Sequence, residues 1–174
     1  MHTKAEFVPL NIAVLTLTDT RTFENDTSGQ TLEELLTAAG HNIAARELCK
    51  DDIYISRAIV SGWIADHLID VVLTTGGTGL TNRDSTPEAL VPLFDTCIEG
   101  FGELFRQLSY DEIGTSTVQS RAVAGLANKT LIFCMPGSTG ACRTGWNRIL
   151  GEQLDSQHRP CNFVAQTRSG EHLL

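Results

Sequence analysis

IDVVLTTGG (Ile69–Gly77) is an apolar run that stops at paired glycines, and TGLTNRDSTPEAL (Thr78–Leu90) follows it directly. Runs of valine, isoleucine and leucine of this kind are typical of strands buried in a parallel sheet. In the second segment Pro87 suits the first turn of a helix, and Thr86 is the expected N-cap. The stretch therefore predicts a buried strand, a glycine-rich loop and a helix in direct succession.

Strand and helix patterns alternate along the rest of the chain. Further strands are expected at NIAVLTLTD (11–19), NIAARELC (42–49) and KTLIFCMPG (129–137). Helices are expected over 26–40, 51–68, 100–114, 117–125 and 141–155, the second with Ile55, Ile59 and Trp63 on one face. This alternation predicts the α/β class: a doubly wound, mostly parallel sheet with helices on both faces, a Rossmann-like three-layer fold. We expect a single domain over residues 1–161 and a C-terminal tail over 162–174.

The composition argues against several classes of protein. Of 174 residues, 41% are hydrophobic and 20% charged, and no apolar run approaches the length of about 20 residues needed to cross a bilayer. The net charge of -8 argues against nucleic acid as a partner, because phosphate backbones are held by clustered Lys and Arg. The five cysteines lack C-x-x-C spacing and are expected to be reduced thiols. The N-terminal MHTKAEFVPL lacks the pattern of a secretory signal, so we expect a cytoplasmic protein.

Two glycine-containing loops follow expected core strands. The first, GGTGLTNRDSTPE (76–88), allows positive φ angles and close approach of the backbone to a ligand. The second, MPGSTGACRTG (135–145), also leaves a strand and enters a helix. In open α/β sheets ligands bind beyond the carboxyl ends of the strands, and free N–H groups at a helix start attract anions. The first loop is either a phosphate cradle or a tight turn before a capped helix, and the pattern favours neither.

Three known motifs do not fit these loops. A dinucleotide-binding G-x-G-x-x-G starting at Gly77 meets Asn82 at its last position, and the G-K-[ST] of a P-loop is absent. A nucleophile elbow G-x-S-x-G needs glycine where this chain has Pro136. Ser138 is therefore interpreted as a phosphate donor or a helix cap rather than as a nucleophile.

Aspartates are expected at the edge of the sheet where these loops lie. Asp84 is in the glycine-rich loop and Asp51 follows the second strand, so both could line one crevice. Mg²⁺ binds through one or two carboxylates together with substrate phosphates, and such a pair would suit it. Capping of the following helix is the alternative role for Asp51 and for Asp52.

Four segments follow one another over nearly the whole chain: VVLTTGGTGLTNRDSTPEAL, EGFGELFR, GTSTVQSRAVAG and TLIFCMPGS. Together they resemble the molybdenum cofactor biosynthesis protein B family, which belongs with the wider molybdopterin adenylyltransferases. The resemblance implies a molybdopterin-binding α/β fold and assembly into a homotrimer or a homohexamer, a dimer of trimers. It also implies Mg²⁺ as cofactor and ATP and molybdopterin as substrates, with adenylyl transfer to the terminal phosphate of molybdopterin and release of pyrophosphate.

The resemblance also implies roles for individual residues. Asp84 matches the family's acidic residue for Mg²⁺-dependent transfer, and Asp51 matches the second acidic position, with Asp52 as the alternative. The implied nucleotide-binding loop is Gly76, Gly77, Thr78 and Gly79, and the implied molybdopterin and phosphate pocket is Ser120, Arg121, Pro136, Gly137 and Ser138. The turn PGSTGA (136–141) departs from the PGNP that many relatives have.

Three functions are compatible with these features. The first hypothesis is an active molybdopterin adenylyltransferase, which both aspartates favour. The second is a non-catalytic molybdopterin carrier or assembly protein of the same pathway, with a molybdenum-insertion protein as a possible partner. The third is a nucleotide-dependent enzyme of other metabolism that shares the fold.

Overall fold

Strand β1 (Asn11–Leu17) lies inside a mixed sheet and pairs in parallel with a strand on each side. The computed structural model describes residues 6–173, and within them the strand order is β2-β1-β3-β6-β5-β4. The other strands are β2 (Asn42–Cys49), β3 (Val71–Thr75), β4 (Thr96–Cys97), β5 (Val123–Ala127) and β6 (Thr130–Met135). β2, β1, β3 and β6 are parallel, whereas β5 pairs antiparallel with β6 and β4 antiparallel with β5.

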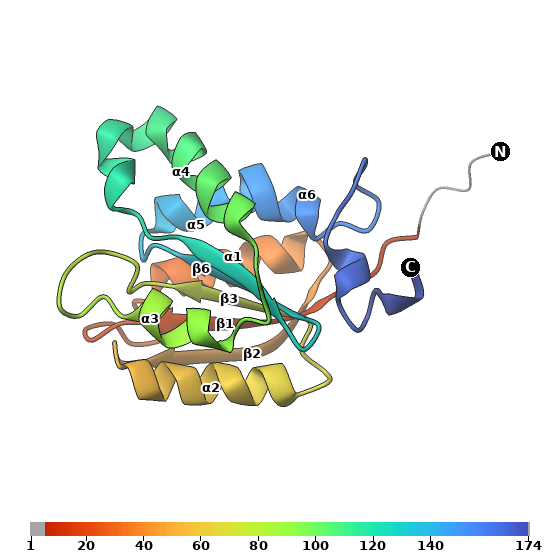
Figure 1. Cartoon of the computed structure of the whole chain (residues 1–174), viewed down its shortest axis with the longest axis horizontal. Helices are drawn as coiled ribbons and strands as arrows, with labels where there is room; N and C mark the ends of the chain where they lie inside the picture. The colour runs from red at the N-terminus through yellow and green to blue at the C-terminus, as the bar shows by residue number, and fades with distance from the viewer. Residues whose placement is uncertain (1–5, 174) are drawn as a thin grey trace.

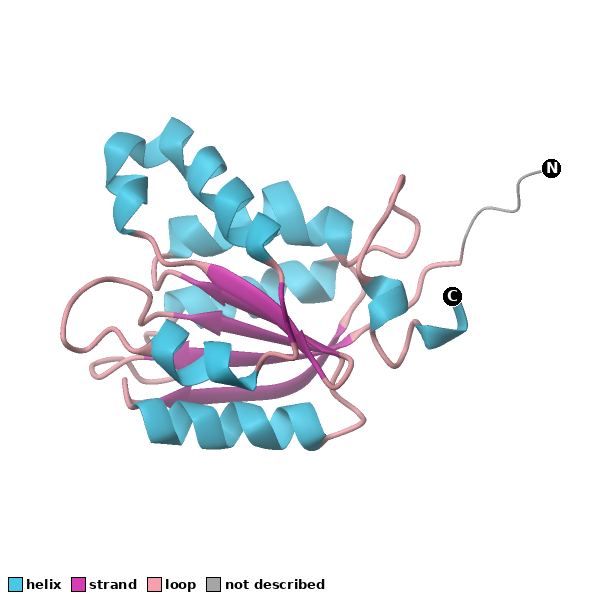
Figure 2. Cartoon of the chain, in the orientation of Figure 1, coloured by secondary structure: helices cyan, strands magenta, loops and turns pink. Residues whose placement is uncertain are grey.

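Helices cover both faces of this sheet (Figure 1). One face packs against α1 (Thr27–Ala38), α4 (Glu99–Ile113), α5 (Thr139–Gly145) and α6 (Gly151–Gln153), and the other against α2 (Ile53–Ala65) and α3 (Thr86–Leu90). Figure 2 shows the sheet enclosed between the two helical layers. A π-helical turn (Trp146–Leu150) joins α5 to α6, and 3-10 turns lie at Val91–Leu93, Gly114–Gln119, Val164–Gln166 and Glu171–Leu173. The predicted three-layer α/β fold is confirmed.

The side chains of β1 show why both faces of the sheet need helices. Ile12 and Val14 pack into the core formed with α1, α4 and α5, whereas Ala13 and Leu15 pack into the core formed with α2 and α3. Removing apolar surface from water contributes about 25 cal/mol per Å², so a strand buried on both faces is strongly held. Polar side chains that could contact a ligand are therefore expected at the ends of such a strand.

The predicted helix over residues 117–125 is wrong. Its first part is a 3-10 turn, and Val123–Ala127 form β5, which is antiparallel to β6. Asn128 and Lys129 link the two strands with φ of 47° and 63°. Positive φ at both central residues is the backbone of a tight hairpin turn that matches the twist of a sheet. Strand pairing through this turn outweighs the helical spacing of the apolar residues.

The buried face of α2 also differs from the prediction. Trp63 is buried and Ile59 packs against the core, but Ile55 is 46% exposed. Ser56 and Val60 take the buried positions two turns and one turn before Trp63. Ser56 can be buried because its hydroxyl donates a hydrogen bond to a backbone carbonyl one turn earlier, at 2.6 Å.

The C-terminal segment, residues 162–173, packs back against the start of β3. Ser169 donates hydrogen bonds from its amide and its hydroxyl to the Asp70 carboxylate, at 3.0 and 2.6 Å. Arg168 Nη1 donates to the carbonyl of Ile69 at 3.1 Å. These bonds hold the segment that the sequence suggested as a tail, and the domain boundary at residue 161 stays a prediction.

Several predictions from composition can be compared with the structure. Within residues 6–173 no helix has the length and apolar character needed to cross a bilayer. Cys49, Cys97, Cys134, Cys142 and Cys161 are free in the described residues, and their reduced state stays a prediction. The prediction of cytoplasmic location rests partly on residues 1–5, which lie outside the described residues.

Candidate functional site

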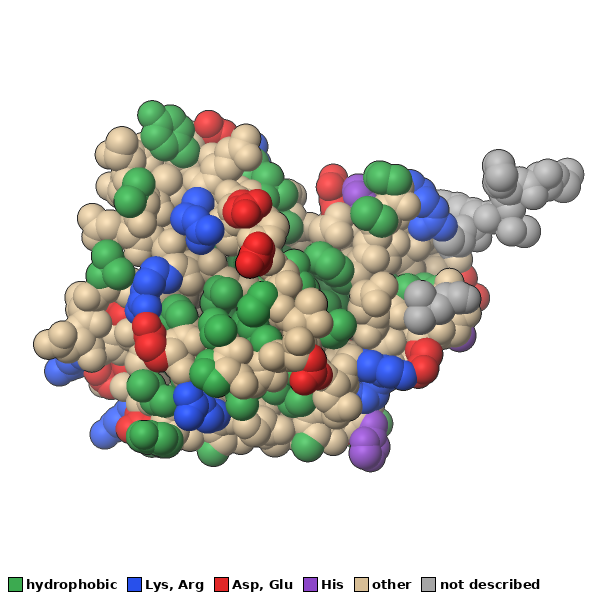
Figure 3. Space-filling view, viewed as in Figure 1, with side chains coloured by type: hydrophobic (Ala, Val, Ile, Leu, Met, Phe, Trp, Pro, Cys, Tyr) green, Lys and Arg blue, Asp and Glu red, His purple; other side chains and the backbone are tan. Residues whose placement is uncertain are grey.

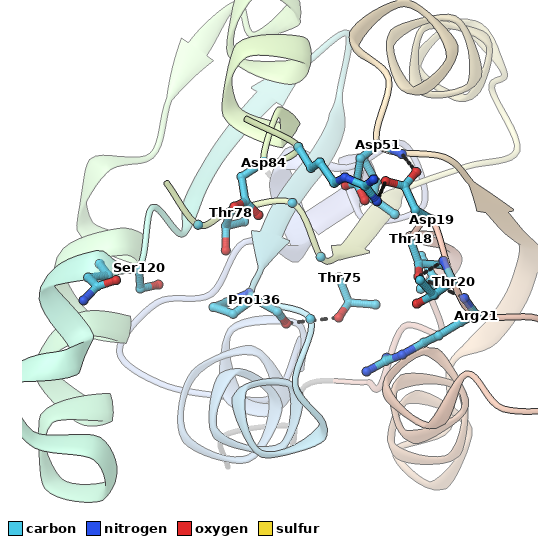
Figure 4. A pocket seen from close by; sticks show the side chains of 18 of the residues that line it. Thr18, Asp19, Thr20, Arg21, Asp51, Thr75, Thr78, Asp84, Ser120 and Pro136 are labelled. Atoms are coloured by element: carbon cyan, nitrogen blue, oxygen red, sulfur yellow. Dashed lines mark hydrogen bonds and ion pairs between the residues drawn. The ribbon is translucent and has the colours of Figure 1, made fainter. Parts of the chain in front are cut away.

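The carboxyl ends of β1, β3 and β6 open into a cleft of about 540 Å³. At this edge the chain order reverses, because β1 has β2 on one side and β3 on the other. Ligands of open α/β sheets bind at such positions. Figure 4 shows polar side chains from several loops directed around one hollow. The cleft is therefore the candidate site.

The glycine-rich loop after β3 can only be built from glycine at two positions. Gly76 has φ of 106° and Gly77 has φ of 67°, both in the left-handed region. A Cβ atom on Gly76 would overlap the carbonyl oxygen of Leu17, and one on Gly77 would overlap Thr86 Oγ1. All four residues of the predicted loop line the cleft: Gly76, Gly77, Thr78 and Gly79.

Thr86 holds this loop in place instead of capping the helix. The expected N-cap of α3 is wrong by one residue: Ser85 takes that position, and Thr86 is the first helical residue. The Thr86 hydroxyl donates to the Gly76 carbonyl at 2.8 Å, and its amide donates to the Gly77 carbonyl at 2.9 Å. The hydroxyl is unavailable as a cap because it satisfies a buried backbone carbonyl of the loop.

Asp51 extends from the end of β2 into the cleft. Its Oδ1 atom is buried and has no hydrogen-bond partner in the described protein, and a Cβ atom on Gly77 would lie 2.9 Å from it. Burial, together with the carboxylates of Asp19 and Asp84, raises the pKa of Asp51 to about 6, whereas Arg83 lowers it. A buried oxygen acceptor without a partner is costly, which suits a site that binds a donor or a cation.

Asp52 has the alternative role. Its carboxylate accepts hydrogen bonds from the amides of Tyr54 and Ile55, at 2.8 and 2.9 Å, and so caps α2. Asp52 does not line the cleft, whereas Asp51 does. Asp52 is thus the helix cap and Asp51 is the candidate cleft residue. The sequence alone did not distinguish these two roles.

Asp84 lies in the same cleft as Asp51 but is held differently. Its Oδ2 atom accepts hydrogen bonds from the amide and the hydroxyl of Thr81, at 2.8 and 2.6 Å. Burial raises the pKa of Asp84, but the hydrogen bonds from Thr81 and from the Gly79 amide outweigh it and bring the pKa below its usual range. Asp84 is therefore an ionised carboxylate fixed in position by its own loop.

Sequence reasoning missed a third carboxylate at this site. Asp19 follows β1, lines the cleft, and forms an ion pair with Arg83 Nη1 at 2.8 Å. The amide of Asp51 also faces Asp19 Oδ1 at 3.4 Å. The sequence could have pointed to Asp19, because it is the last residue of TLTD, the polar segment at the end of the first strand. The carboxyl end of that strand lies at the same edge of the sheet as the other loops.

Ser120, Pro136 and Gly137 line the cleft opposite the aspartates. Ser120 Oγ is buried and has no hydrogen-bond partner in the described protein. Thr75 donates to the carbonyl of Pro136 at 3.0 Å and fixes the turn after β6 (Figure 4). Ser138 does not line the cleft, because its hydroxyl accepts from the Ala141 amide at 3.1 Å and caps α5.

Arg121 does not line the cleft either, which corrects the expectation from the sequence. Its Nε donates to the Gly79 carbonyl at 2.8 Å and its Nη2 to the Asp84 carbonyl at 3.0 Å. Its Nη1 pairs with Glu88, and this bond lowers the pKa of Glu88. Nε, Nη1 and Nη2 each make one of these contacts, so the guanidinium braces the glycine-rich loop.

The donor set fits a hard divalent cation. The unpartnered Asp51 Oδ1 and the ionised Asp84 are oxygen donors of the kind that Mg²⁺ prefers. In the described part of the chain, no three His, Cys, Asp or Glu side chains are grouped closely enough to form a complete metal cage. A cation at this site would take its remaining ligands from water or from substrate oxygens.

Comparison with known proteins places this chain in a family. Residues 13–156 match the model of a probable molybdopterin binding domain. Molybdenum cofactor biosynthesis protein B of Escherichia coli strain K12 is 59% identical over 158 residues, which cover 91% of this chain and 93% of the relative. The chain belongs to the molybdenum cofactor biosynthesis protein B family.

Other members of the protein B family agree in sequence and in structure. The relative in Bacillus subtilis strain 168 is 45% identical over 143 residues, which cover 81% of this chain and 84% of the relative. A crystal structure of a molybdenum cofactor biosynthesis protein B has a TM-score of 0.81 at 46% identity, covering 84% of this chain and 91% of that chain. The tungsten cofactor synthesizing protein MoaB from Pyrococcus furiosus has a TM-score of 0.75 at 35% identity, covering 83% and 92%.

Proposed function

We propose that this chain acts in molybdenum cofactor biosynthesis, where it binds molybdopterin and adenylylates its terminal phosphate with Mg-ATP. The observation that supports the proposal most is the unpartnered, buried Asp51 Oδ1 in a cleft that also contains Asp84 and the glycine-rich loop. Family membership supports the pathway, since the relatives are molybdenum cofactor biosynthesis proteins.

The proposed step is an in-line displacement at phosphorus. An oxygen of the molybdopterin phosphate forms a bond to the α-phosphorus of ATP, while the bond from that phosphorus to the bridging oxygen breaks. The bridging oxygen keeps the electron pair and leaves with pyrophosphate. Both reactants are anionic, so the protein needs charge neutralisation and alignment more than covalent help.

Residues of the cleft have separate parts in this step. Asp51 and Asp84 would hold Mg²⁺, which when bound supplies positive charge against the phosphate oxygens. The loop Gly76–Gly79 lets backbone amides approach the nucleotide phosphates, because two of its glycines adopt positive φ. Ser120 Oγ faces the cleft without a protein partner and would bind the pterin or its phosphate.

A non-catalytic molybdopterin carrier of the same pathway is the second candidate. Two hydrogen bonds from Thr81 already occupy Asp84 Oδ2, so this carboxylate has one oxygen without a side-chain role in its own loop. The same cleft could bind a substrate without performing transfer.

Turnover distinguishes the two candidates. We expect the protein with molybdopterin, ATP and Mg²⁺ to release pyrophosphate, and Asp84→Asn and Asp51→Asn to release at least about tenfold less while still binding molybdopterin. Asp111→Asn is the matched control, because Asp111 is an exposed residue of α4 outside the cleft and should keep full turnover. Molybdopterin binding without pyrophosphate from the wild type would favour the carrier.

We also propose that the chain works as a homotrimer or homohexamer in the cytoplasm, with a molybdenum-insertion protein as possible partner. Tyr110, Ile113 and Val118, at the end of α4 and in the turn after it, are 57%, 53% and 78% exposed. Figure 3 shows hydrophobic side chains on the surface over the end of α4. Exposed apolar side chains in one short segment favour burial against another subunit. Analytical ultracentrifugation would show a trimer or hexamer mass, and a monomer at micromolar concentration would contradict the assembly.

A further inference from the structure

We infer that Arg21 binds the terminal phosphate of the acceptor pterin, a role that no sequence motif assigned to it. The inference rests on the proposed function, because it concerns how the acceptor is held in the same cleft. Arg21 lies in the loop after β1 and lines the cleft.

The charges of the cleft are divided between two regions. Asp19, Asp51 and Asp84 form one region, and Arg83 is ion-paired with Asp19 within it. Figure 4 shows Arg21 extended away from Asp51 and Asp84, below Thr75 and Pro136. Arg21 and Arg83 are the arginines among the described residues that line the cleft, so the second region has Arg21 as its cation.

The positive charge of Arg21 is only partly balanced by a carboxylate. Its Nη1 donates to the hydroxyl of Ser28 at 2.8 Å and forms a long ion pair with Asp26 Oδ1 at 3.6 Å. The carboxylate of Asp26 is buried and already bound by Arg46 at 2.6 Å and by the Thr16 hydroxyl at 2.6 Å. Arg46 is thus the closer cation partner of Asp26, and it also pairs with Glu33 at 3.4 Å. Arg21 is the more distant partner of Asp26 and lines the cleft.

Arg21 is also held in a fixed orientation. The Ser28 hydroxyl that accepts from Arg21 donates in turn to Asp26 Oδ1 at 3.1 Å. The amide of Arg21 is bound by Thr18 Oγ1 at 3.2 Å, which fixes the backbone of the loop. The side chain is 34% exposed, so the rest of its guanidinium can reach a ligand. A preoriented guanidinium binds phosphate oxygens through two hydrogen bonds at little further entropic cost.

This assignment explains how the cleft can hold two anions. A nucleotide with its cation suits the region of the aspartates, since carboxylates and Mg²⁺ bind together. The acceptor phosphate would be repelled there, and it needs a cation of its own. Arg121 is less suited to supply it, because it does not line the cleft and its Nε, Nη1 and Nη2 each bind the Gly79 carbonyl, Glu88 or the Asp84 carbonyl.

Binding of molybdopterin and of dephosphorylated molybdopterin tests the inference. We expect Arg21→Gln to weaken molybdopterin binding at least about tenfold, measured by pterin fluorescence, and to change Mg-ATP binding less than about twofold. Removing the phosphate should weaken binding to the wild type by a similar factor but leave binding to Arg21→Gln unchanged. Arg21→Lys should restore part of the affinity. Arg143→Gln is the matched control, because Arg143 is exposed, carries the same charge and lies outside the cleft lining.

The possible outcomes are distinct. Equal molybdopterin binding by the wild type and Arg21→Gln would overturn the inference and leave the proposed function standing. Arg21→Gln could also weaken the binding of molybdopterin and of dephosphorylated molybdopterin by the same factor. That result would overturn the inference as well, since Arg21 would then act only through the shape of the loop. No molybdopterin binding by the wild type would overturn the proposed function together with the inference. An unchanged thermal midpoint in Arg21→Gln excludes loss of folding as the cause.

Discussion

Replacing Asp51 with asparagine should stabilise the protein at neutral pH, although the residue is proposed to be functional. The pKa of Asp51 is raised from 3.8 to about 6 by burial and by Asp19 and Asp84. Because the native state binds the proton more tightly than the unfolded state, this carboxyl stabilises fully below pH 3.8 and loses that contribution as the pH rises through about 6. A rise of this size corresponds to at most about 3 kcal/mol. Since the cleft is open to solvent, we expect about 1 kcal/mol.

Urea denaturation in the presence of a chelator measures this effect. We compare the free energy of unfolding of Asp51→Asn with that of the wild type at each pH. The difference should shift in favour of the variant by about 1 kcal/mol between pH 4 and pH 8. Asp52→Asn is the control, because Asp52 caps α2 outside the cleft. Asparagine caps a helix about as well as aspartate, so the stability of Asp52→Asn should stay close to that of the wild type at both pH values.

A second measurement tests the proposed Mg²⁺-binding role of Asp51 separately from its effect on stability. Mg²⁺ should raise the thermal midpoint of the wild type at pH 8 and raise that of Asp51→Asn less, because a ligand stabilises only the state that binds it. A stability difference between Asp51→Asn and the wild type that stays constant from pH 4 to pH 8 would refute the reasoning. Asp51 would then have an ordinary pKa, and its unpartnered oxygen would need another explanation.

Three further changes test how the loops and the C-terminal segment are held. Gly76→Ala should cost about 2 kcal/mol or more, since φ of 106° is strained for alanine and its Cβ would overlap the Leu17 carbonyl; thermal denaturation checks it. Thr86→Val keeps the shape but leaves the Gly76 carbonyl unpaired, so chemical denaturation should show a loss of about 1–3 kcal/mol, and no loss would argue against the role of the hydroxyl. Truncation after residue 161 removes both Ser169 donors of the buried Asp70 and leaves it the Asn11 amide, so it should cost about 3 kcal/mol or more by urea titration, whereas unchanged stability would make residues 162–174 a true tail.

The fold could be predicted because the sequence pattern and the packing agree. β3 and its two neighbours in the sheet, β1 and β6, are buried on both faces, so their continuous apolar runs read clearly as strands. The segment 117–125 was misassigned because small and branched residues suit both helix and strand. Its pairing with β6 depends on a hairpin turn at Asn128 and Lys129, residues whose positive φ the spacing of apolar positions does not reveal.

The position of the site could be predicted, but the direction of its side chains could not. Asp51 and Asp84 line one cleft because parallel strands end at the same edge of the sheet. Whether an arginine faces the cleft or its own scaffold depends on the partners it finds. Arg121 is bound to loop carbonyls, whereas Arg21 is oriented by Ser28, which lies at the start of the next helix.

Single-turnover transfer of label from α-³²P-ATP, with protein in excess over molybdopterin, tests the central claim most directly. The account predicts that the label moves to the pterin in the presence of Mg²⁺, with one pyrophosphate released for each pterin adenylylated. Label that stays entirely in ATP while molybdopterin is bound would contradict it.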